Sequence, residues 1–358
     1  QMACLRDSWI VKRQKNIAFI QRHLWKKGSG IPITGIWLIS MKNKAMDMNK
    51  NEKIYIAGHR GLVGTALTHR LLQKGYKNIL TRTSSEMDLV CQKSVEDFLV
   101  KEKPDWVIMV AANHGGIQAN LSHTAEFLYD NMMINFNLIH AALLAGVKKI
   151  INISASCVYP ESIFEPFRED MLFSGPVQKG TEGYAWAKAM GIRYCQICNA
   201  QFGTKFTSLL PVNLYGRNVS FDPEQTGVLP AMIKRFHDAV KHHKSEVCIW
   251  GDGKARREFL HVEDLVSAVE LLLNVEHEDD TYNVGSGEWI SIQELASICA
   301  DICGYKGKIL NDLTRPKGTS RQKLDSGRLK LLGWEPKVSL RNGIMDLYRY
   351  ALETNLLE

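Results

Sequence analysis

The sequence predicts an α/β protein with a doubly wound parallel sheet and a smaller C-terminal α/β domain. An apolar strand at 54–57 runs directly into Gly58, Gly61 and Gly64, and a helix-forming stretch, Thr65–Gln73, follows. Apolar strands and helices then alternate up to about Gly216, as they do when parallel strands are joined by crossover helices.

The glycine turn predicts a dinucleotide site in a Rossmann sheet. Glycines allow a tight turn and let the backbone approach a pyrophosphate at the positive end of the following helix. The spacing G-x-x-G-x-x-G is typical of extended short-chain dehydrogenases, although a tight turn without a ligand is the alternative interpretation. The candidate cofactor residues in this turn are Gly58, Arg60, Gly61, Leu62, Val63 and Gly64.

The end of the second strand indicates which cofactor is used. An acidic residue there favours NAD, but the chain reads Ile79-Leu80-Thr81-Arg82-Thr83-Ser84. Arg82 and Arg60 are two cations without a carboxylate, which suits a 2′-phosphate and predicts NADPH. Either arginine could instead be an ordinary solvated charge.

Later segments continue the pattern. Asp105–Ala112 is predicted as a buried strand, Asn131–Ala145 as a long helix and Lys149–Ser154 as the next strand. Ligands of such sheets bind at the carboxyl ends of the strands. After about Gly216 the pattern becomes irregular, which predicts a nucleotide-binding domain at 48–215 and a mainly substrate-binding domain at 216–358.

Composition narrows the functional classes. The 358 residues are 45% hydrophobic and 23% charged, with a net charge of +7. Residues 1–47 hold nine Lys or Arg and two Asp or Glu. The remaining residues hold 36 Lys or Arg and 36 Asp or Glu, so their formal net charge is zero. The body therefore gives no electrostatic argument for nucleic acid. No apolar run approaches the ~20 residues of a membrane span. Residues 1–47 are expected to be an extension outside the catalytic fold, with Met48 a possible natural start.

The cysteines predict neither disulfides nor a metal site. Eight cysteines in a chain of this size without an export signal indicate a reducing, cytoplasmic setting. Cys195 and Cys198 resemble half a zinc site, but no second pair completes it, and helix packing is the better explanation.

Tyr184 and Lys188 form the predicted catalytic pair. Four-residue spacing places both side chains on one helix face. A Lys ammonium favours the phenolate and eases proton transfer at a neighbouring carbonyl. Of the eleven tyrosines only Tyr184 has a lysine four residues later. A pair on a helix surface without a catalytic role is the alternative.

Six motifs run in order through the chain from Met48 to its end. They are Gly58-His59-Arg60-Gly61, Gly115-Gly116-Ile117, Asn131-Met132-Met133-Ile134, Ser156-Cys157-Val158-Tyr159-Pro160, Asn213-Leu214-Tyr215-Gly216 and Arg257-Glu258-Phe259-Leu260-His261-Val262. With these motifs the chain resembles the GDP-L-fucose synthase family, bifunctional GDP-4-keto-6-deoxy-mannose 3,5-epimerase/4-reductases. The resemblance implies NADPH, a homodimer and a GDP-sugar bound between the domains. By motif position it implies substrate contacts from Asn213, Arg235, Trp250 and Arg257.

In the family chemistry a Cys and a His invert C3 and C5, because the 4-ketone acidifies the hydrogens on these carbons. Hydride from NADPH then reduces C4, with a Tyr as the proton donor. Cys157 fits the Cys position, although a base role would require an electropositive surrounding. A small buried thiol without a catalytic role is the alternative.

Two positions depart from the family pattern. Gly227 stands where the family has its His, and Ala155 stands where the family has the hydroxyl that helps the Tyr. Ser156, beside Ala155, is the candidate hydroxyl. His114, after the strand at 105–112, is the candidate replacement acid, or else a residue that hydrogen-bonds substrate.

Three functions follow from these patterns. The first is the full epimerase and reductase activity of the family. The second is 4-keto reduction alone, on a related GDP-sugar. The third, a non-catalytic NADPH-binding sensor, is disfavoured because a sensor has no use for Tyr184 and Lys188.

Overall fold

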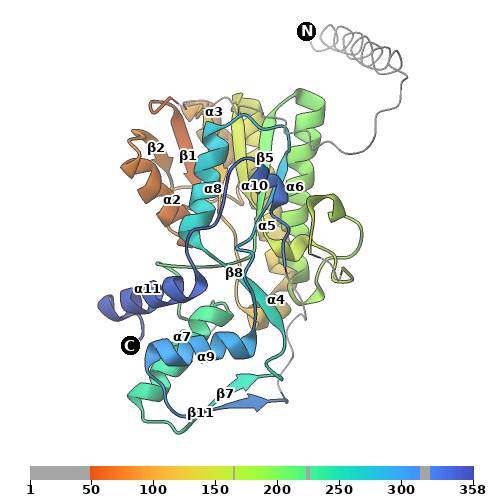
Figure 1. Cartoon of the computed structure of the whole chain (residues 1–358). Helices are drawn as coiled ribbons and strands as arrows, with labels where there is room; N and C mark the ends of the chain where they lie inside the picture. The colour runs from red at the N-terminus through yellow and green to blue at the C-terminus, as the bar shows by residue number, and fades with distance from the viewer. Residues whose placement is uncertain (1–48, 164–165, 223–225, 315–322) are drawn as a thin grey trace, which may run out of the picture. The chain divides into compact units, whose positions relative to one another are not determined.

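In the computed structural model, six parallel strands form the central sheet in the order β2-β1-β3-β4-β5-β9 (Figure 1). The structure describes residues 49–163, 166–222, 226–314 and 323–358, all within the compact unit Asn43–Glu358. The expected extension at 1–47 lies outside the described residues. The strands are β1 (Lys53–Ala57), β2 (Asn78–Thr81), β3 (Trp106–Met109), β4 (Lys149–Ile153), β5 (Lys205–Pro211) and β9 (Thr281–Val284).

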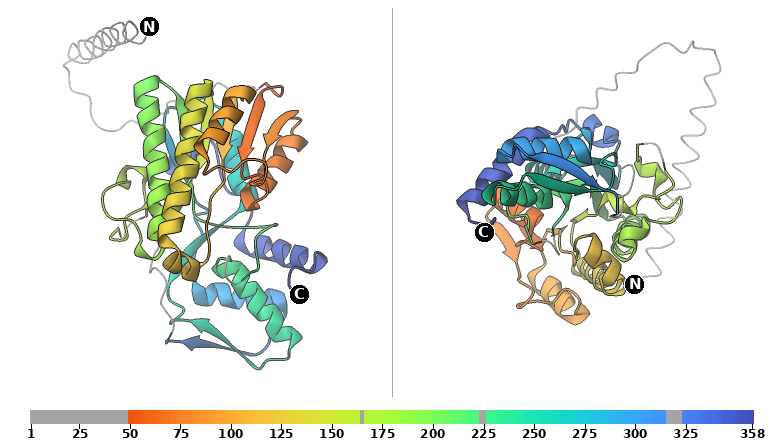
Figure 2. Two further views of the ribbon diagram at one scale, coloured as in Figure 1. Left: turned by 180° about the vertical axis from the view of Figure 1, so that it is seen from behind. Right: turned by 90° about the horizontal axis from the view of Figure 1, so that it is seen from below.

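Helices cover both faces of this sheet, which confirms the doubly wound fold. Ile54 and Ile56 of β1 pack with α2 (Leu62–Gln73) and α8 (Val262–Asn274). Tyr55 and Ala57, which point the other way because strand side chains alternate, pack with the opposite helix layer. That layer, seen in Figure 2, left, comprises α3 (Gln92–Glu102), α5 (Thr124–Ala145) and α6 (Glu182–Phe202).

Most elements after the first five strands build a second core. A three-stranded sheet runs in the order β10-β8-β6 and a two-stranded sheet pairs β11 with β7. Three helices, α7, α9 and α11, enclose this core with Phe236 and Leu295 among its fully buried residues. The elements are β6 (Asn213–Tyr215), α7 (Val228–Lys241), β7 (Glu246–Trp250), β8 (Arg256–His261), β10 (Trp289–Ser291), α9 (Ile292–Cys303), β11 (Lys308–Asp312) and α11 (Leu340–Glu353). The short helix α10 (Gly327–Leu331) packs beside β9, and its Leu329 belongs to the first core.

Several predicted boundaries were wrong. The first helix begins at Leu62, three residues before the predicted Thr65, because Gly61 already serves as its N-cap. The helix predicted from Asn131 begins at Thr124. The strand predicted over 105–112 spans only Trp106–Met109, and β4 ends at Ile153. After Gly216, where the sequence pattern is irregular, short strands alternate with four helices of 12 to 14 residues.

The predicted division near Gly216 stays a prediction. Strand β9 pairs in parallel with β5, and helix α8 packs beside α2. Both come from the second half of the chain and contribute to the first sheet and its cover. Dividing the chain at Gly216 would therefore assign β9 and α8 to the second domain, although both pack in the first core.

Candidate active site

The turn between β1 and α2 depends on glycine geometry. Gly58 has φ +91°, and a Cβ there would lie 2.6 Å from the Ala111 amide nitrogen. A Cβ on Gly64 would collide with the Gly58 carbonyl oxygen. Gly61 has an ordinary φ of −77°, and its Cβ would meet nothing nearer than the Gly58 oxygen at 3.8 Å. The space before the amino end of α2 therefore lies open, and a pyrophosphate fits there.

His59 is a residue of this turn that the sequence reasoning missed. Its Nδ1 is buried and has no hydrogen-bond partner within the described residues. An unpaired buried polar atom costs about 1–3 kcal/mol, so a bound ligand or a water that pairs with it would stabilise the turn. Its position inside the glycine motif could have identified His59 from the sequence as a residue of the cofactor turn.

Arg82 immediately follows β2, beside the glycine turn. Its guanidinium donates to the Thr81 carbonyl at 2.8 Å and lies 4.8 Å from the Phe98 ring centroid. Glu86, four residues later, accepts from the Thr83 amide at 2.7 Å and hydroxyl at 2.8 Å, so that carboxylate is engaged locally. Arg60 is exposed, and neither arginine pairs with a carboxylate in the described part of the chain. Both charges are available to a phosphate.

Tyr184 and Lys188 lie on the first turns of α6. The Lys188 Nζ is 5.8 Å from the Tyr184 ring centroid and donates to the Ile153 carbonyl, at the carboxyl end of β4, at 2.9 Å. Lys188 is 3% exposed, and burial lowers its pKa to about 8. Burial also raises the pKa of the Tyr184 phenol. At neutral pH the pair is therefore a protonated phenol beside an ammonium, a suitable proton donor.

Cys157 lies in the short 3₁₀ turn η1 (Ser156–Val158), which directly follows β4. Burial raises the pKa of its half-buried thiol to about 11, while the Thr181 side chain and the Lys188 charge act in the opposite direction. A thiolate base requires a positive charge nearby that lowers the pKa of the thiol. Lys188 has this effect on Cys157, but desolvation raises the pKa by more. In this state Cys157 is a neutral thiol that can donate a proton.

The residues around Ala155 do not form a regular strand. Ala155 is extended, with φ −158° and ψ 156°, and carries no hydroxyl. The Ser154 hydroxyl donates to the Lys188 carbonyl at 3.5 Å, which directs it to the α6 backbone. Ser156 is buried and begins the turn that carries Cys157. Ser156 therefore follows the carboxyl end of β4, where the Ile153 carbonyl accepts from Lys188.

His114 lies in a non-regular segment after β3. His114 is an exposed residue, yet neighbouring protein atoms desolvate its imidazole and lower its pKa, and the Lys188 charge adds to this effect. The backbone of the preceding residue, Asn113, is clamped by buried Asn131. Asn131 Oδ1 accepts from the Asn113 amide at 2.9 Å, and its Nδ2 donates to the Asn113 carbonyl at 2.7 Å. His114 is thus a neutral imidazole near Lys188, on a fixed backbone.

Gly227 is the N-cap of α7 and is exposed. Its φ of −78° and ψ of 174° suit any residue, and a Cβ there would meet nothing within 4 Å. The backbone does not demand glycine here, so the missing His is not explained by strain. Gly227 itself can transfer no proton.

The four candidate substrate residues form two pairs, one on strands β6 and β8 and one on helix α7 and strand β7. Asn213 of β6 donates to the Glu258 carbonyl at 3.0 Å, next to Arg257 of the adjacent strand β8. Arg235 of α7 donates to the Cys248 carbonyl at 2.7 Å, two residues before Trp250 at the end of β7. Burial lowers the pKa of Arg257 to about 10, and Trp250 is 50% exposed.

No metal-binding group was found among the residues that the structure describes. Cys195 and Cys198 are fully buried in the packing of α6. No helix in the described ranges is both long and apolar enough to cross a membrane.

Comparison with known proteins first gives the class. The model of the NAD dependent epimerase/dehydratase family matches residues 54–285, from β1 past β9. This range contains the glycine turn, Cys157 and the Tyr184–Lys188 pair. Fold and site thus define an enzyme of the epimerase/dehydratase class.

Individual relatives make the family specific. GDP-L-fucose synthase 1 of Arabidopsis thaliana is 43% identical over 85% of this chain and 94% of its own length. GDP-L-fucose synthase of Escherichia coli is 40% identical over 84% and 97%. GDP-mannoheptose C4 reductase from Campylobacter jejuni, solved with NADP bound, is 34% identical with a TM-score of 0.77 over 85% and 99%. The chain belongs to the GDP-L-fucose synthase family, as its motifs predicted.

Proposed function

We propose that this chain is an NADPH-dependent enzyme that converts a GDP-4-keto-6-deoxyhexose by 3,5-epimerisation and 4-keto reduction. One observation carries the proposal: the Tyr184–Lys188 pair and Cys157 meet at the carboxyl end of β4, within a chain that matches GDP-L-fucose synthases over most of its length. Nucleotide-sugar biosynthesis is the corresponding pathway.

The glycine turn and two arginines support NADPH as the cofactor. Gly58, Gly61 and Gly64, with the following residues Leu62 and Val63, would hold the pyrophosphate at the amino end of α2. Arg60 and Arg82 would contact the 2′-phosphate, and Lys188 would contact the ribose. When bound, NADPH supplies the hydride for C4.

Reduction of the ketone needs a proton at its oxygen. The Tyr184 hydroxyl is protonated at neutral pH and can donate that proton. The Lys188 ammonium stabilises the phenolate that remains, because opposite charges attract strongly in a buried site. Ser156 would supply the further hydrogen bond that the family obtains at the position of Ala155.

Epimerisation needs a base on one face of the sugar and an acid on the other. Removing the proton from C3 or C5 leaves an enolate conjugated with C4, and a proton returned from the opposite face inverts the carbon. Besides Tyr184, which serves the reduction, Cys157 and His114 can exchange protons, and the Lys188 charge acts on both. In the described state His114 is neutral and Cys157 is a thiol, so His114 is ready to accept and Cys157 to donate.

Reduction alone is the second candidate function. Two observations favour it: Gly227 offers no proton, and Ala155 offers no hydroxyl. The relative from C. jejuni is named as a C4 reductase. A sensor without catalysis is disfavoured by the pairing of half-buried Tyr184 with buried Lys188.

A single incubation distinguishes these functions. GDP-4-keto-6-deoxymannose and NADPH are supplied, and the product's configuration at C3, C4 and C5 is read by NMR. Inversion at C3 and C5 with reduction at C4 supports the full activity. Reduction with retained configuration supports the reductase, and NADPH binding without any oxidation supports the sensor.

Exchange in D₂O tests the epimerase pair. If His114 is the second proton-transfer group, the parent incorporates deuterium at C3 and C5. His114→Ala then abolishes inversion while C4 reduction continues. If it does not serve, exchange is slow in the parent, and Gly227→His raises it by about 10²-fold, the low end of general acid–base catalysis. The open space and ordinary φ at Gly227 make this variant tolerable. Inversion that persists in both Cys157→Ser and His114→Ala contradicts the assignment.

A homodimer is also proposed, formed through the outer face of α5 and α6 in a cytoplasmic protein. A groove of about 480 Å³ lies between these helices, lined by Phe136, Tyr194 and other residues. Exposed apolar side chains continue along both helices: Tyr129, Phe136, Leu144, Ile197 and Phe202. Such a contiguous apolar face usually marks an interface. Phe136→Glu should shift sedimentation from dimer to monomer, whereas Leu331→Glu, at an exposed residue of α10, should not.

A further inference from the structure

The turn that carries Cys157 is closed by Tyr159. The Tyr159 amide donates to the Ser156 carbonyl at 3.3 Å, and the Val158 amide donates to the Ala155 carbonyl at 3.4 Å. Cys157 is therefore a central residue of a hydrogen-bonded turn. The residue at its exit determines how the turn is held.

Tyr159 is a fully buried anchor. Its ring is 0% exposed and stacks on Phe167, with centroids 4.8 Å apart. Its hydroxyl donates to Asn283 Oδ1, on β9, at 2.7 Å. The turn is thus tied to the central sheet by one short side-chain hydrogen bond across 124 residues of sequence.

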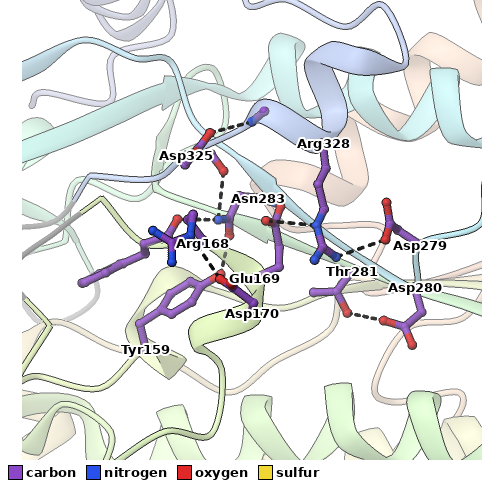
Figure 3. Close-up of polar contacts among 12 residues, drawn as sticks. Tyr159, Arg168, Glu169, Asp170, Asp279, Asp280, Thr281, Asn283, Asp325 and Arg328 are labelled. Atoms are coloured by element: carbon purple, nitrogen blue, oxygen red, sulfur yellow. Dashed lines mark hydrogen bonds and ion pairs between the residues drawn. The ribbon is translucent and has the colours of Figure 1, made fainter. Parts of the chain in front are cut away.

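Both polar atoms of the Asn283 side chain and its backbone amide form hydrogen bonds. Its Nδ2 donates to the Phe167 carbonyl at 2.7 Å and to the Asp325 carbonyl at 3.1 Å, and its amide donates to Glu169 Oε1 at 2.8 Å. Figure 3 shows Asn283 among Tyr159, Glu169 and Asp325. Three hydrogen bonds hold the Asn283 side chain and a fourth holds its backbone amide, so this 0% exposed residue is a rigid acceptor for Tyr159.

Arg328 marks the outer edge of the same network. It lies 3.5 Å from Glu169 Oε2 and 3.2 Å from Asp279 Oδ1, and its side chain is 37% exposed (Figure 3). Removing Arg328 disturbs the network but leaves the Tyr159–Asn283 bond in place. It therefore provides a matched control.

We propose that Asn283 is a positioning residue for Cys157, acting through the Tyr159 hydroxyl on the exit of the Ser156–Tyr159 turn. The proposal rests on the proposed function insofar as Cys157 transfers protons at C3 and C5. Asn283 touches neither reacting atom. It sets the orientation of the thiol by fixing the backbone that bears it.

The test is Tyr159→Phe, which removes one hydroxyl and keeps the stacked ring. Two properties are measured: the alkylation rate of Cys157 by iodoacetamide, read by peptide mass spectrometry, and the ratio of C3/C5 deuterium exchange to C4 reduction. Alkylation of Cys157 should rise, since the freed turn exposes its thiol, while exposed Cys91 and Cys248 in the same sample should not change. The exchange-to-reduction ratio should fall about tenfold, since a 1 Å misplacement can cost ~10²-fold.

Arg328→Gln should leave both properties at the parent value. A merely structural role of Asn283 would lower exchange and reduction together in Tyr159→Phe and leave Cys157 alkylation unchanged, which overturns the proposal. If the parent shows no exchange, the epimerase function fails, but alkylation still decides the positioning role. Should Tyr159→Phe not fold, Asn283→Ser is measured in the same way, and the same increase in Cys157 alkylation is expected.

Discussion

At the residue scale, Lys188 connects the candidate catalytic groups. Its ammonium lies near the Tyr184 ring, contributes to the pKa of His114 and Cys157, and donates to the end of β4. A single buried charge therefore acts on a phenol, an imidazole and a thiol. Each of these groups is held in the neutral form mainly by its own desolvation, and the Lys188 charge lowers the pKa of both His114 and Cys157.

Tyr184→Phe tests the reductase step. The variant loses the phenol that lies beside Lys188 and protonates the ketone oxygen, so NADPH consumption should fall by at least about 10²-fold, the low end of general acid catalysis. Cofactor binding, measured by fluorescence titration, should be retained. Tyr350→Phe, in α11, is the control and should keep parent turnover. Near-normal turnover in Tyr184→Phe would remove Tyr184 from the mechanism.

The sequence predicted residues whose partners are close along the chain. Tyr184 and Lys188 were found because four residues correspond to about one helical turn. Asn131 and Asn283 were not recognised, because their partners Asn113 and Tyr159 lie 18 and 124 residues away. The burial that raises the pKa of Cys157 was likewise invisible, since desolvation depends on the folded surroundings.

At the scale of elements, the strand–turn–helix unit formed by β1 and α2 was predictable and its boundary was not. The glycines predict the turn. Gly61, in the extended conformation, is the N-cap of α2, so the helix begins at the next residue, Leu62. Leu62, Val63 and Gly64 thus belong to the first turn of α2. The free amide groups of that turn are the ones a pyrophosphate can use.

The elements after Gly216 were harder to predict. α7 has its apolar residues on one face, yet it packs with α9 and α11, which come much later in the chain. β9 has only four residues, and it is a strand because β5 offers a parallel edge. Short strands of this kind are specified by partners and not by local sequence.

Cofactor choice is a property of the β1–α2 turn together with the end of β2. In the parent, kcat/KM should clearly favour NADPH over NADH. Arg60→Ser with Arg82→Ser should narrow that preference by about tenfold or more, because hydrogen bonds to charged groups contribute about 1.5–3 kcal/mol. Arg349→Ser, at an exposed residue of α11, should leave the ratio unchanged. Equal kcat/KM for both cofactors in the parent would contradict the assignment.

At the scale of the whole molecule, buried carboxylates tie the late chain to the sheets. Glu258 is 0% exposed and accepts from the Gly287 amide at 2.6 Å and the Leu324 amide at 2.8 Å. Glu169 likewise accepts from Asn283. Burial raises the pKa of both carboxyl groups, while the backbone hydrogen bonds act in the opposite direction. These contacts hold segments that local sequence would leave as loops.

The last prediction concerns global stability as a function of pH. Lys188 has a pKa of about 8 in the folded protein against an ordinary value of 10.5. The unfolded chain therefore binds more protons between about pH 8 and 10.5, and the Lys188 contribution to the free energy of unfolding rises across that window. Below pH 8 the folded state bears the full cost of a buried ammonium, roughly 3 kcal/mol.

Lys188→Met should remove that cost and lose the hydrogen bond to Ile153, worth about 1 kcal/mol. The expected result at pH 7 is an inactive protein that is more stable by roughly 1–2 kcal/mol, and the gain should shrink between about pH 8 and 10.5. Urea unfolding of parent and variant at several pH values measures this difference. Lys330→Met, at an exposed lysine of α10, should show no such window. A variant that is less stable than the parent at pH 7 would mean that the ammonium stabilises the fold as well as the reaction.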